Sequence, residues 1–355
     1  MNKRILALCL LVSMIAGSNA FASRARQSVM GTGDAGLILQ DGSFFYDHAY
    51  NIFYNPAYVN DFKNWAIIEK SNGNTRGAQG GFVTSLTNFN LGVFMNRASS
   101  QTGGTNAVNS LNAYNFDSSQ TRPIDVIIGG DMGVKWGLGA TYNNSSANGG
   151  FNDLVLRAGI VYMDLEPFVN YKIKGAQKVT GAADRTTKDF TIGTKYRMGE
   201  FTPYAAFRQL KANTLTNNEK DTIIGGGIGR NTKLAEGARL VYALSYFHSK
   251  FSGNFASTRN VIPVDVAIEG DAATWLTLRA GIRYKLMNKT SGTGTQTDDT
   301  TGRVGATVHA NKVDVDWAFG SSNSAAGSAG TENIDSPAIG FDSGTFSEIA
   351  LSYKW

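Results

Sequence analysis

From residue 64 onward, apolar and polar residues alternate with a period of two along most of the chain. In residues 274–286, Leu278 and Leu286 share one face of the segment, and Arg279 and Lys285 share the other. The same alternation recurs at residues 190–198, 238–247 and 313–319. A helical period is nearly absent, so the pattern predicts β-strands with one apolar and one polar face.

Connectors of two lengths separate these segments, and short and long ones alternate along the chain. The long ones are rich in Gly, Ser, Thr and Asn, as in TSGTGTQTDDTTG. Short turns are expected at Thr87-Asn88, Gly130-Asp131, Met163-Asp164, Gly199-Glu200, Gly270-Asp271 and Asn311-Lys312, with a longer one at 229–237. About sixteen segments fit between the connectors, each of about ten residues, the length of a tilted strand that crosses a bilayer.

This arrangement predicts an all-β fold, a transmembrane antiparallel up-and-down β-barrel of about sixteen strands. A soluble β-sandwich also alternates, but one of this size would leave sheet edges to protect and would normally divide into domains. Closing the sheet pairs every backbone group, as hydrocarbon requires. In a bacterial outer membrane, the short turns would face the periplasm and the long loops the outside.

The first 22 residues have the features of a cleavable signal peptide. Lys3 and Arg4 precede an apolar stretch, and the segment ends in Ala20-Phe21-Ala22. Cys9, the only cysteine, lies within it, so the expected mature chain has no disulfide. Removing residues 1–22 lowers the formal net charge from +5 to +3. No run of basic residues marks a nucleic-acid partner, and charged residues make up only 17%, which is low for a soluble surface.

The last ten residues, FSEIALSYKW, alternate strictly up to a terminal aromatic. They resemble the C-terminal β-signal of bacterial outer-membrane proteins, with matching positions at Ile349, Leu351, Tyr353 and Trp355. The resemblance implies recognition by the barrel-assembly machinery and location in the outer membrane, in contact with its lipid and lipopolysaccharide.

If the apolar phase faces lipid, the opposite phase lines the barrel. The basic residues of that phase are Arg157, Lys172, Lys195, Arg197, Arg208, Arg239, Arg279, Arg283 and Lys285. Its acidic residues are Asp265, Asp314, Asp316 and Glu348. Sequence order is angular order in a closed meander, so the two signs are expected on different arcs of the wall.

Such arcs predict a water-filled pore for passive diffusion of small hydrophilic solutes, with a mild preference for anions. The alternative is that the charges pair across the barrel and fill it. Residues 98–121 form a long loop that would either constrict the pore or stay on the surface. A homotrimer is possible, although no sequence feature establishes it.

Residues 23–63 do not follow the strand pattern, and residues 64–355 are taken as the barrel. The triplet Asn55-Pro56-Ala57, after YNIFY, resembles the hatch of FadL-type transporters of hydrophobic compounds, whose barrels are expected to have fourteen strands. With SRARQSVMGTGDAG, FYNPAYVNDFKNW and the aromatic end, the chain also resembles the major outer-membrane proteins of Bdellovibrio-type predatory bacteria. That resemblance implies an abundant porin-like barrel. Residues 23–63 would either plug the barrel or pack on its rim.

The sequence contains no clear motif for a catalytic or metal-binding site. The three histidines, His48, His248 and His309, have no obvious spacing for a catalytic triad or a metal site. GGGIG at residues 225–229 has no following Lys-Ser/Thr or helix, so a crowded or bent strand is expected there. Asp298-Asp299 is read as solvated loop acid. The sequence predicts no enzyme, metal or cofactor. A structural or surface-interaction role for the long loops is the remaining alternative.

Overall fold

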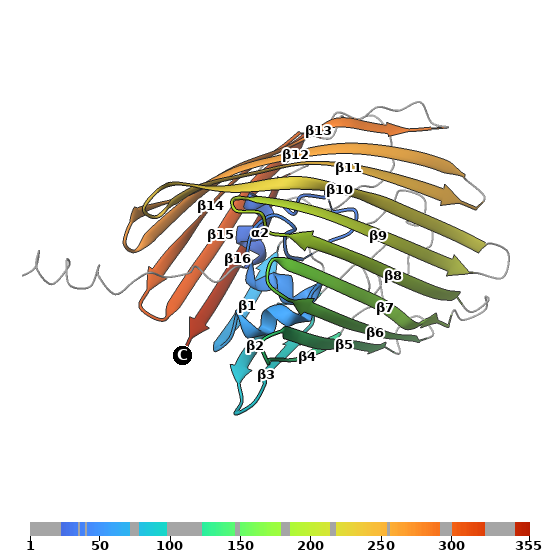
Figure 1. Cartoon of the computed structure of the whole chain (residues 1–355), viewed down its shortest axis with the longest axis horizontal. Helices are drawn as coiled ribbons and strands as arrows, with labels where there is room; N and C mark the ends of the chain where they lie inside the picture. Colours follow the sequence, from blue (N-terminus) through green and yellow to red (C-terminus); the bar gives the residue numbers. More distant parts are fainter. Residues whose placement is uncertain are drawn as a thin grey trace, which may run out of the picture.

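A computed structural model shows a closed antiparallel β-barrel of sixteen strands (Figure 1). It describes residues 23–34, 36–39, 41–71, 78–97, 123–145, 150–178, 185–213, 218–253, 256–291, 300–323 and 345–355. The predicted signal peptide, the loop predicted at residues 98–121 and Asp298-Asp299 therefore lie outside the described residues. No helix among the described residues is long and apolar enough to cross a membrane.

Each strand pairs with its sequence neighbours, and the first strand pairs with the last. The expected count of sixteen is therefore confirmed, and fourteen is wrong. The strands are β1 (Trp65–Ser71), β2 (Gln79–Ser85), β3 (Asn90–Met95), β4 (Ile124–Asp131), β5 (Lys135–Ser145), β6 (Phe151–Val161), β7 (Leu165–Gln177), β8 (Arg185–Tyr196), β9 (Phe201–Asn213), β10 (Asn218–Ala235), β11 (Ala238–Ser252), β12 (Ser257–Ala273), β13 (Leu276–Thr290), β14 (Thr300–Ala310), β15 (Val313–Asn323) and β16 (Thr345–Lys354).

Strand length varies more than the expected ten residues. It runs from 6 residues in β3 to 18 in β10. Three short turns differ from the sequence expectation, because in each case a strand continues further than expected. β4 runs to Asp131, so the turn expected at Gly130-Asp131 lies at 132–134. The 229–237 connector is a tight turn at 236–237, because β10 continues to Ala235. The turn expected at Gly270-Asp271 lies at Thr274-Trp275, because β12 runs to Ala273 through a register shift.

The two phases of the strands face opposite sides of the wall. On β13, Leu278 and Leu286 are 47% and 52% exposed on the outside, whereas Arg279 and Lys285 are each 4% exposed on the inside. Leu244 and Tyr246 of β11 are also exposed on the outside. On these strands the outer face is thus apolar, and on β13 the inner face is polar, as the alternation predicts. Apolar Phe94 of β3 and Ile127 of β4 also face inward, where they join the core shared with residues of the 23–63 segment.

Residues 23–63 lie inside the barrel as a plug, drawn in blue in Figure 1. The plug contains α2 (Arg24–Met30) and two 3₁₀ turns, η1 (Ala49–Phe53) and η2 (Pro56–Asn60). Ser23 caps α2 by accepting a hydrogen bond from the Arg26 amide. α2 packs against β12–β16 and η2 against β3–β6, so the plug contacts separate arcs of the wall.

Candidate functional site: a plugged lumen

The charged residues assigned to the lumen from the sequence face the interior, but most are buried. Those buried are Arg157, Lys172, Lys195, Arg208, Arg279, Lys285, Asp265, Asp314 and Asp316. The partly exposed ones are Arg197, Arg239, Arg283 and Glu348. Because the plug covers much of the lumen, these side chains do not line an open water column in this structure.

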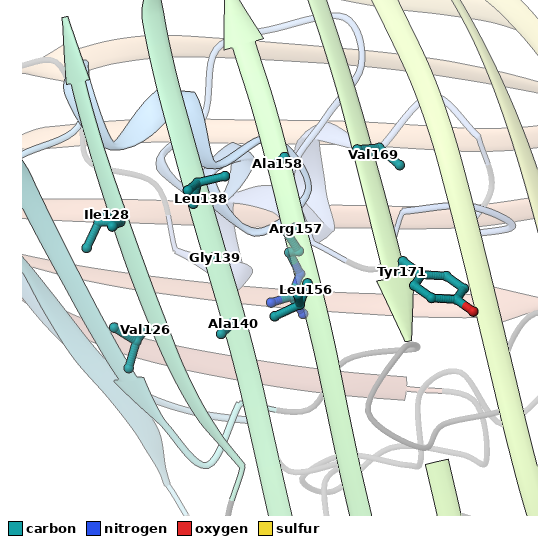
Figure 2. A pocket seen from close by; sticks show the side chains of 10 residues that line it. All are labelled: Val126, Ile128, Leu138, Gly139, Ala140, Leu156, Arg157, Ala158, Val169 and Tyr171. Atoms are coloured by element: carbon teal, nitrogen blue, oxygen red, sulfur yellow. The ribbon is translucent and has the colours of Figure 1, made fainter. Parts of the chain in front are cut away.

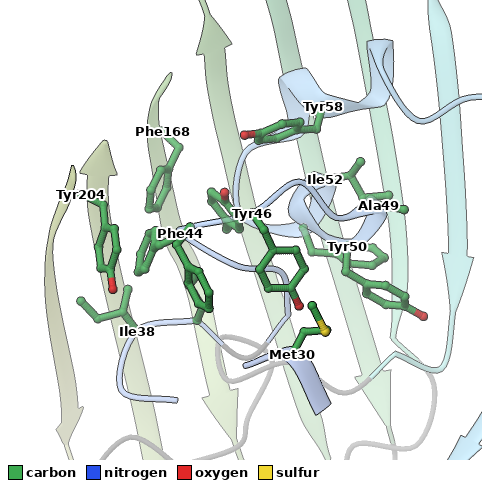
Figure 3. Close-up of a cluster of buried hydrophobic side chains, with 14 of the residues drawn as sticks. Met30, Ile38, Phe44, Tyr46, Ala49, Tyr50, Ile52, Tyr58, Phe168 and Tyr204 are labelled. Atoms are coloured by element: carbon green, nitrogen blue, oxygen red, sulfur yellow. The ribbon is translucent and has the colours of Figure 1, made fainter. Parts of the chain in front are cut away.

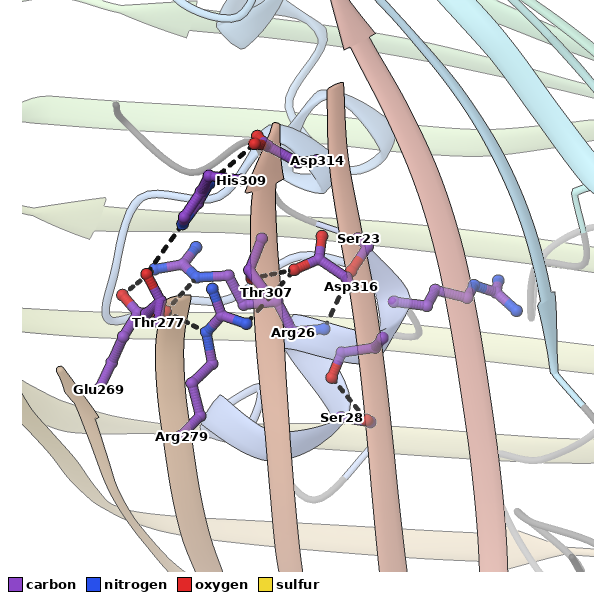
Figure 4. A network of polar contacts seen from close by, with 12 residues as sticks. Ser23, Arg26, Ser28, Glu269, Thr277, Arg279, Thr307, His309, Asp314 and Asp316 are labelled. Atoms are coloured by element: carbon purple, nitrogen blue, oxygen red, sulfur yellow. Dashed lines mark hydrogen bonds and ion pairs between the residues drawn. The ribbon is translucent and has the colours of Figure 1, made fainter. Parts of the chain in front are cut away.

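α2 is held to the wall by a buried cluster of charges (Figure 4). The guanidinium of Arg26 donates to both carboxylate oxygens of Glu269 on β12, at 2.7 and 3.0 Å. Arg239 pairs with the same carboxylate at 2.7 Å, and so does Arg279. Arg279 also reaches Asp316, at 3.3 Å. Burial alone would lower the pKa of Arg26, but Glu269 outweighs it and the pKa is raised.

A second cluster holds the segment between α2 and η1. Arg197 pairs with Asp47 of the plug at 2.7 Å and also with Glu166 of β7. Lys195 lies 3.3 Å from Glu166, and Tyr58 of η2 donates a hydrogen bond to the same carboxylate. Burial would raise the pKa of Asp47, but Lys195 and Arg197 outweigh it and hold the pKa below its ordinary value.

A third cluster links the plug to β3 and β4 through Arg97, a residue that directly follows β3. Arg97 pairs with Asp41 of the plug at 2.5 Å and with Asp125 of β4 at 2.8 Å. Its guanidinium also lies 3.8 Å from the centre of the Phe53 ring. Arg157 of β6 completes the cluster, 3.2 Å from Asp125.

Two further contacts fix the chain between α2 and η1. The backbone amide of Gly33 donates to Asp265 at 3.1 Å, and Arg283 pairs with the same carboxylate at 2.7 Å. Arg208 of β9 donates to the Leu37 carbonyl at 3.3 Å. Charged wall residues thus contact the plug along much of its length.

Aromatic side chains fill the space between these clusters (Figure 3). Phe44 stacks on Tyr204 of β9, with ring centroids 4.9 Å apart. Tyr54 meets Phe168 of β7 edge to face at the same centroid distance. Apolar residues of the plug and of the wall therefore form one packed core.

The Asn55-Pro56-Ala57 triplet lies against β5 and β6. The Asn55 side chain accepts from the Ala57 amide at 3.1 Å and donates to the Ile160 carbonyl at 3.3 Å. Pro56 packs on Gly137 of β5 so closely that a Cβ atom there would overlap its backbone. The triplet thus caps η2 and anchors it to the wall.

The expected separation of the two charge signs into different arcs is wrong. Inward-facing acids also occur early and midway along the chain, where the sequence analysis assigned only bases. They include Asp125, Asp153, Glu166 and Asp189. Glu269 is a further inward acid, on the same strand as Asp265. Most lie near strand ends, beyond the segments recognised from alternation. Extending the phase of Thr191, Gly193 and Lys195 back along β8 would have reached Asp189.

His309 takes part in a polar ladder that the sequence spacing did not reveal. Its Nδ1 atom lies 2.7 Å from Asp314 and its Nε2 atom 2.9 Å from the Thr277 hydroxyl (Figure 4). Thr277 also donates to Asp271 at 2.6 Å. The Asp271 carboxylate therefore competes with His309 for the hydroxyl hydrogen, and the ladder ties together the ends of β12–β15. Among the described residues, no group of three or more His, Cys, Asp or Glu side chains is arranged to hold a metal ion.

The four residues of the predicted C-terminal signal point outward from the wall. Ile349, Leu351, Tyr353 and Trp355 are 45–56% exposed. β16 pairs with β1 from Trp65↔Lys354 to Ser71↔Glu348, which closes the barrel.

The outer surface over β4–β7 contains an apolar groove of about 470 Å³ (Figure 2). Exposed Ile128, Leu138 and Leu156 rise beside it. Ala140 and Ala158 of the outward phase supply no comparable bulk between them, which leaves the groove.

Comparison with protein-family models gives no match, and comparison with curated proteins gives none. Among solved structures, the CymD monoaromatic hydrocarbon channel is 11% identical, with a TM-score of 0.43, over 96% of this chain and 99% of that one. OmpT of Vibrio cholerae is 11% identical, with a TM-score of 0.41, over 82% and 95%. An anion-selective porin from Comamonas acidovorans is 9% identical, with a TM-score of 0.39, over 82% and 98%. At these values the likeness carries no argument about this chain, whose architecture rests on its own strand pairing.

Proposed function

We propose that this chain is a bacterial outer-membrane channel for small hydrophilic solutes, closed by its own residues 23–63. The observation that carries the proposal is the set of ion pairs that join the plug to the lumen wall, above all Arg26–Glu269 and Arg97–Asp41. Water and dissolved ions can replace such pairs when the plug moves. The wall that is then uncovered is charged, which suits polar solutes.

Membrane placement is supported by the height of the outward apolar band. On β10, Lys220 and Arg230 are ten positions apart, and Ile224 and Ile228 between them are exposed on the outer surface. At the usual rise per residue and strand tilt, this separation corresponds to about 25 Å across the membrane. The short turns would face the periplasm.

Transport of apolar compounds is the second candidate, and the aromatic packing of the plug favours it. Phe44 of the plug contacts Tyr204 and Phe168 of the wall. When the plug moves, these rings would offer an apolar solute a surface to bind along its path. An apolar ligand that co-purifies inside the barrel would favour this reading.

Selectivity among ions follows from the pairing of charges in the lumen. Bases and acids alternate around the wall, which predicts weak selectivity, and the mild anion preference expected from the sequence stays a prediction. The reversal potential in a salt gradient measures it. The homotrimer also stays a prediction, and sedimentation equilibrium in detergent tests it.

A reversible tether tests the plug and the channel together. A Cβ atom at Gly139 would lie 3.5 Å from Pro56 Cγ, so side chains at these two positions meet, and we choose a Pro56→Cys/Gly139→Cys pair as the tether. In planar bilayers, we expect the oxidised protein to show no single-channel steps. Reduction should restore brief openings, and deletion of residues 23–60 should give long-lived ones.

The single variant Gly139→Cys serves as the control, because it cannot form the tether. Its conductance should not respond to reductant. Heat-modifiable gel mobility verifies that each variant is a folded barrel. A folded deletion variant without steps would show that the barrel does not conduct, and identical steps in the oxidised and reduced double variant would show that the plug does not close it.

A further inference from the structure

Four lysines form a row on the outer surface, at the long-loop ends of four consecutive strands. Lys188 of β8 is directly opposite Lys211 of β9, which is directly opposite Lys220 of β10. Lys250 of β11 lies one diagonal step further, since its direct partner is Thr222 of β10. All four side chains are exposed and belong to the outward phase of their strands.

These lysines have no acidic partner among the residues that the structure describes. Like charges directly opposite each other on neighbouring strands destabilise a sheet. At the short-turn end, by contrast, exposed bases are paired: Arg230 with Glu200 and Lys233 with Glu236, each at 2.7 Å. The row therefore carries a repulsion that a bound anion would relieve.

The row lies at the upper edge of the apolar band. Lys220 is ten positions along β10 from Arg230, which lies at the short-turn edge of the band, and Lys211 is directly opposite Lys220. Aromatic rings lie directly beneath it on the outer surface, where Phe190 and Phe207 are 6.3 Å apart. An aromatic girdle followed by lysines marks the boundary between hydrocarbon and headgroups.

We propose that Lys188, Lys211, Lys220 and Lys250 form a binding site for the phosphate groups of an anionic glycolipid in the outer leaflet. Neighbouring strands are about 4.8 Å apart, so the row spans about 14 Å, enough for two phosphates on one headgroup. Each lysine offers a flexible point charge to a phosphate oxygen. A lipid fits better than free phosphate, because the alkyl stems and aromatic rings below the row would contact its chains.

The proposal rests on the membrane placement argued above but not on conduction. It is tested with the full mature chain in neutral detergent micelles, titrated with diphosphorylated lipid A. We expect the thermal unfolding midpoint to rise with lipid A in the wild type. The Lys188→Gln/Lys211→Gln/Lys220→Gln/Lys250→Gln variant should need about tenfold more lipid, or greater, for the same shift.

The matched control is Lys233→Gln, at the short-turn end, which should respond to lipid A as the wild type does. Dephosphorylated lipid A should give little shift with any variant, and inorganic phosphate at the same concentration should give none. Equal shifts in the wild type and the quadruple variant would overturn the site. Equal shifts with inorganic phosphate would overturn the lipid as its ligand.

Removing like charges should not impair folding, and the single variant Lys211→Gln, at the centre of the row, provides a milder second measurement. Heat-modifiable mobility reports barrel insertion independently. A protein that inserts but shows no difference between variants overturns only the lysine site. A protein that does not insert into micelles or bilayers overturns the membrane placement itself.

Discussion

Three arginines share the carboxylate of Glu269, and one of them, Arg26, belongs to the plug. At the scale of single residues, this carboxylate decides how firmly α2 is held. Its own side chain is 4% exposed, so the charges around it have little water to compensate for its loss. Removing one partner of a buried ion cluster is costly because the remaining charges stay buried.

We therefore expect Glu269→Gln to lower the free energy of unfolding by about 3–5 kcal/mol. Urea denaturation in detergent measures the loss. Glu236→Gln removes an exposed turn carboxylate, 95% exposed and paired with Lys233, and should leave unfolding unchanged. Equal effects of the two substitutions would show that the Glu269 cluster does not hold the plug.

His48 makes the plug sensitive to acid. Its Nδ1 atom accepts a hydrogen bond from the Tyr50 amide at 3.0 Å. Burial, reinforced by nearby Arg26, holds its pKa well below 6.5. The folded plug therefore contains neutral imidazole, and its stability is lost as pH falls below the ordinary pKa of histidine.

Below pH 6.5, we expect the free energy of unfolding of the wild type to fall by up to about 1.4 kcal/mol per pH unit from this group. His48→Asn keeps a side-chain acceptor at the cap and removes the titration, so its slope should be smaller. Urea midpoints at pH 7.5, 6.5 and 5.5 compare the two proteins. Parallel slopes would contradict this role of His48.

At the scale of elements, alternation predicts strands well and their ends poorly. Alternation identified the segment that forms β11, but the structure extends it to Ser252, because polar residues such as Ser249 and Lys250 continue the pairing. A strand end is set by cross-strand hydrogen bonds, and its own side chains do not reveal them. The same limit hid Asp189, and with it the true distribution of acids.

η2 depends on the missing side chain of Gly137. A methyl group there would overlap Pro56, so we expect Gly137→Ala to displace η2 and to lower the free energy of unfolding by about 1–3 kcal/mol. Limited proteolysis should also cut the plug faster. Gly302→Ala on β14 is the matched control, because its methyl group would meet open space. A Gly137→Ala protein as stable and protease-resistant as Gly302→Ala would rule out this packing.

At the scale of the whole molecule, the barrel was predictable, whereas the plug was only one of two alternatives for residues 23–63. Period-two alternation specifies which side chains face in, and the connector lengths specify the meander. Neither says what occupies the lumen, because the plug has no strand period. Its contacts, such as Arg26–Glu269, join residues 243 positions apart. Such contacts follow from the folded geometry and leave no local pattern.

Residues of β16, which pairs with β1 to close the barrel, allow a role in assembly to be distinguished from a role in stability. Tyr353 and Trp355 point outward and stack with centroids 6.2 Å apart. If they serve as an assembly signal, Tyr353→Ala/Trp355→Ala should slow insertion by the assembly machinery several-fold and leave spontaneous refolding in detergent unchanged. Tyr246→Ala, equally outward on β11, should affect neither. Equal slowing of both processes would show a purely structural role.

Because the barrel closes only where β16 meets β1, and residues 23–63 lie inside it, the order of events during biogenesis is constrained. The plug precedes every strand in the chain, and a sealed wall offers it no side entrance. We therefore expect the N-terminal segment to lie inside the forming barrel, or to enter it from one open end, before β16 pairs with β1. The barrel would then already contain its plug when it closes, and a newly inserted molecule would not let solutes pass through the outer membrane.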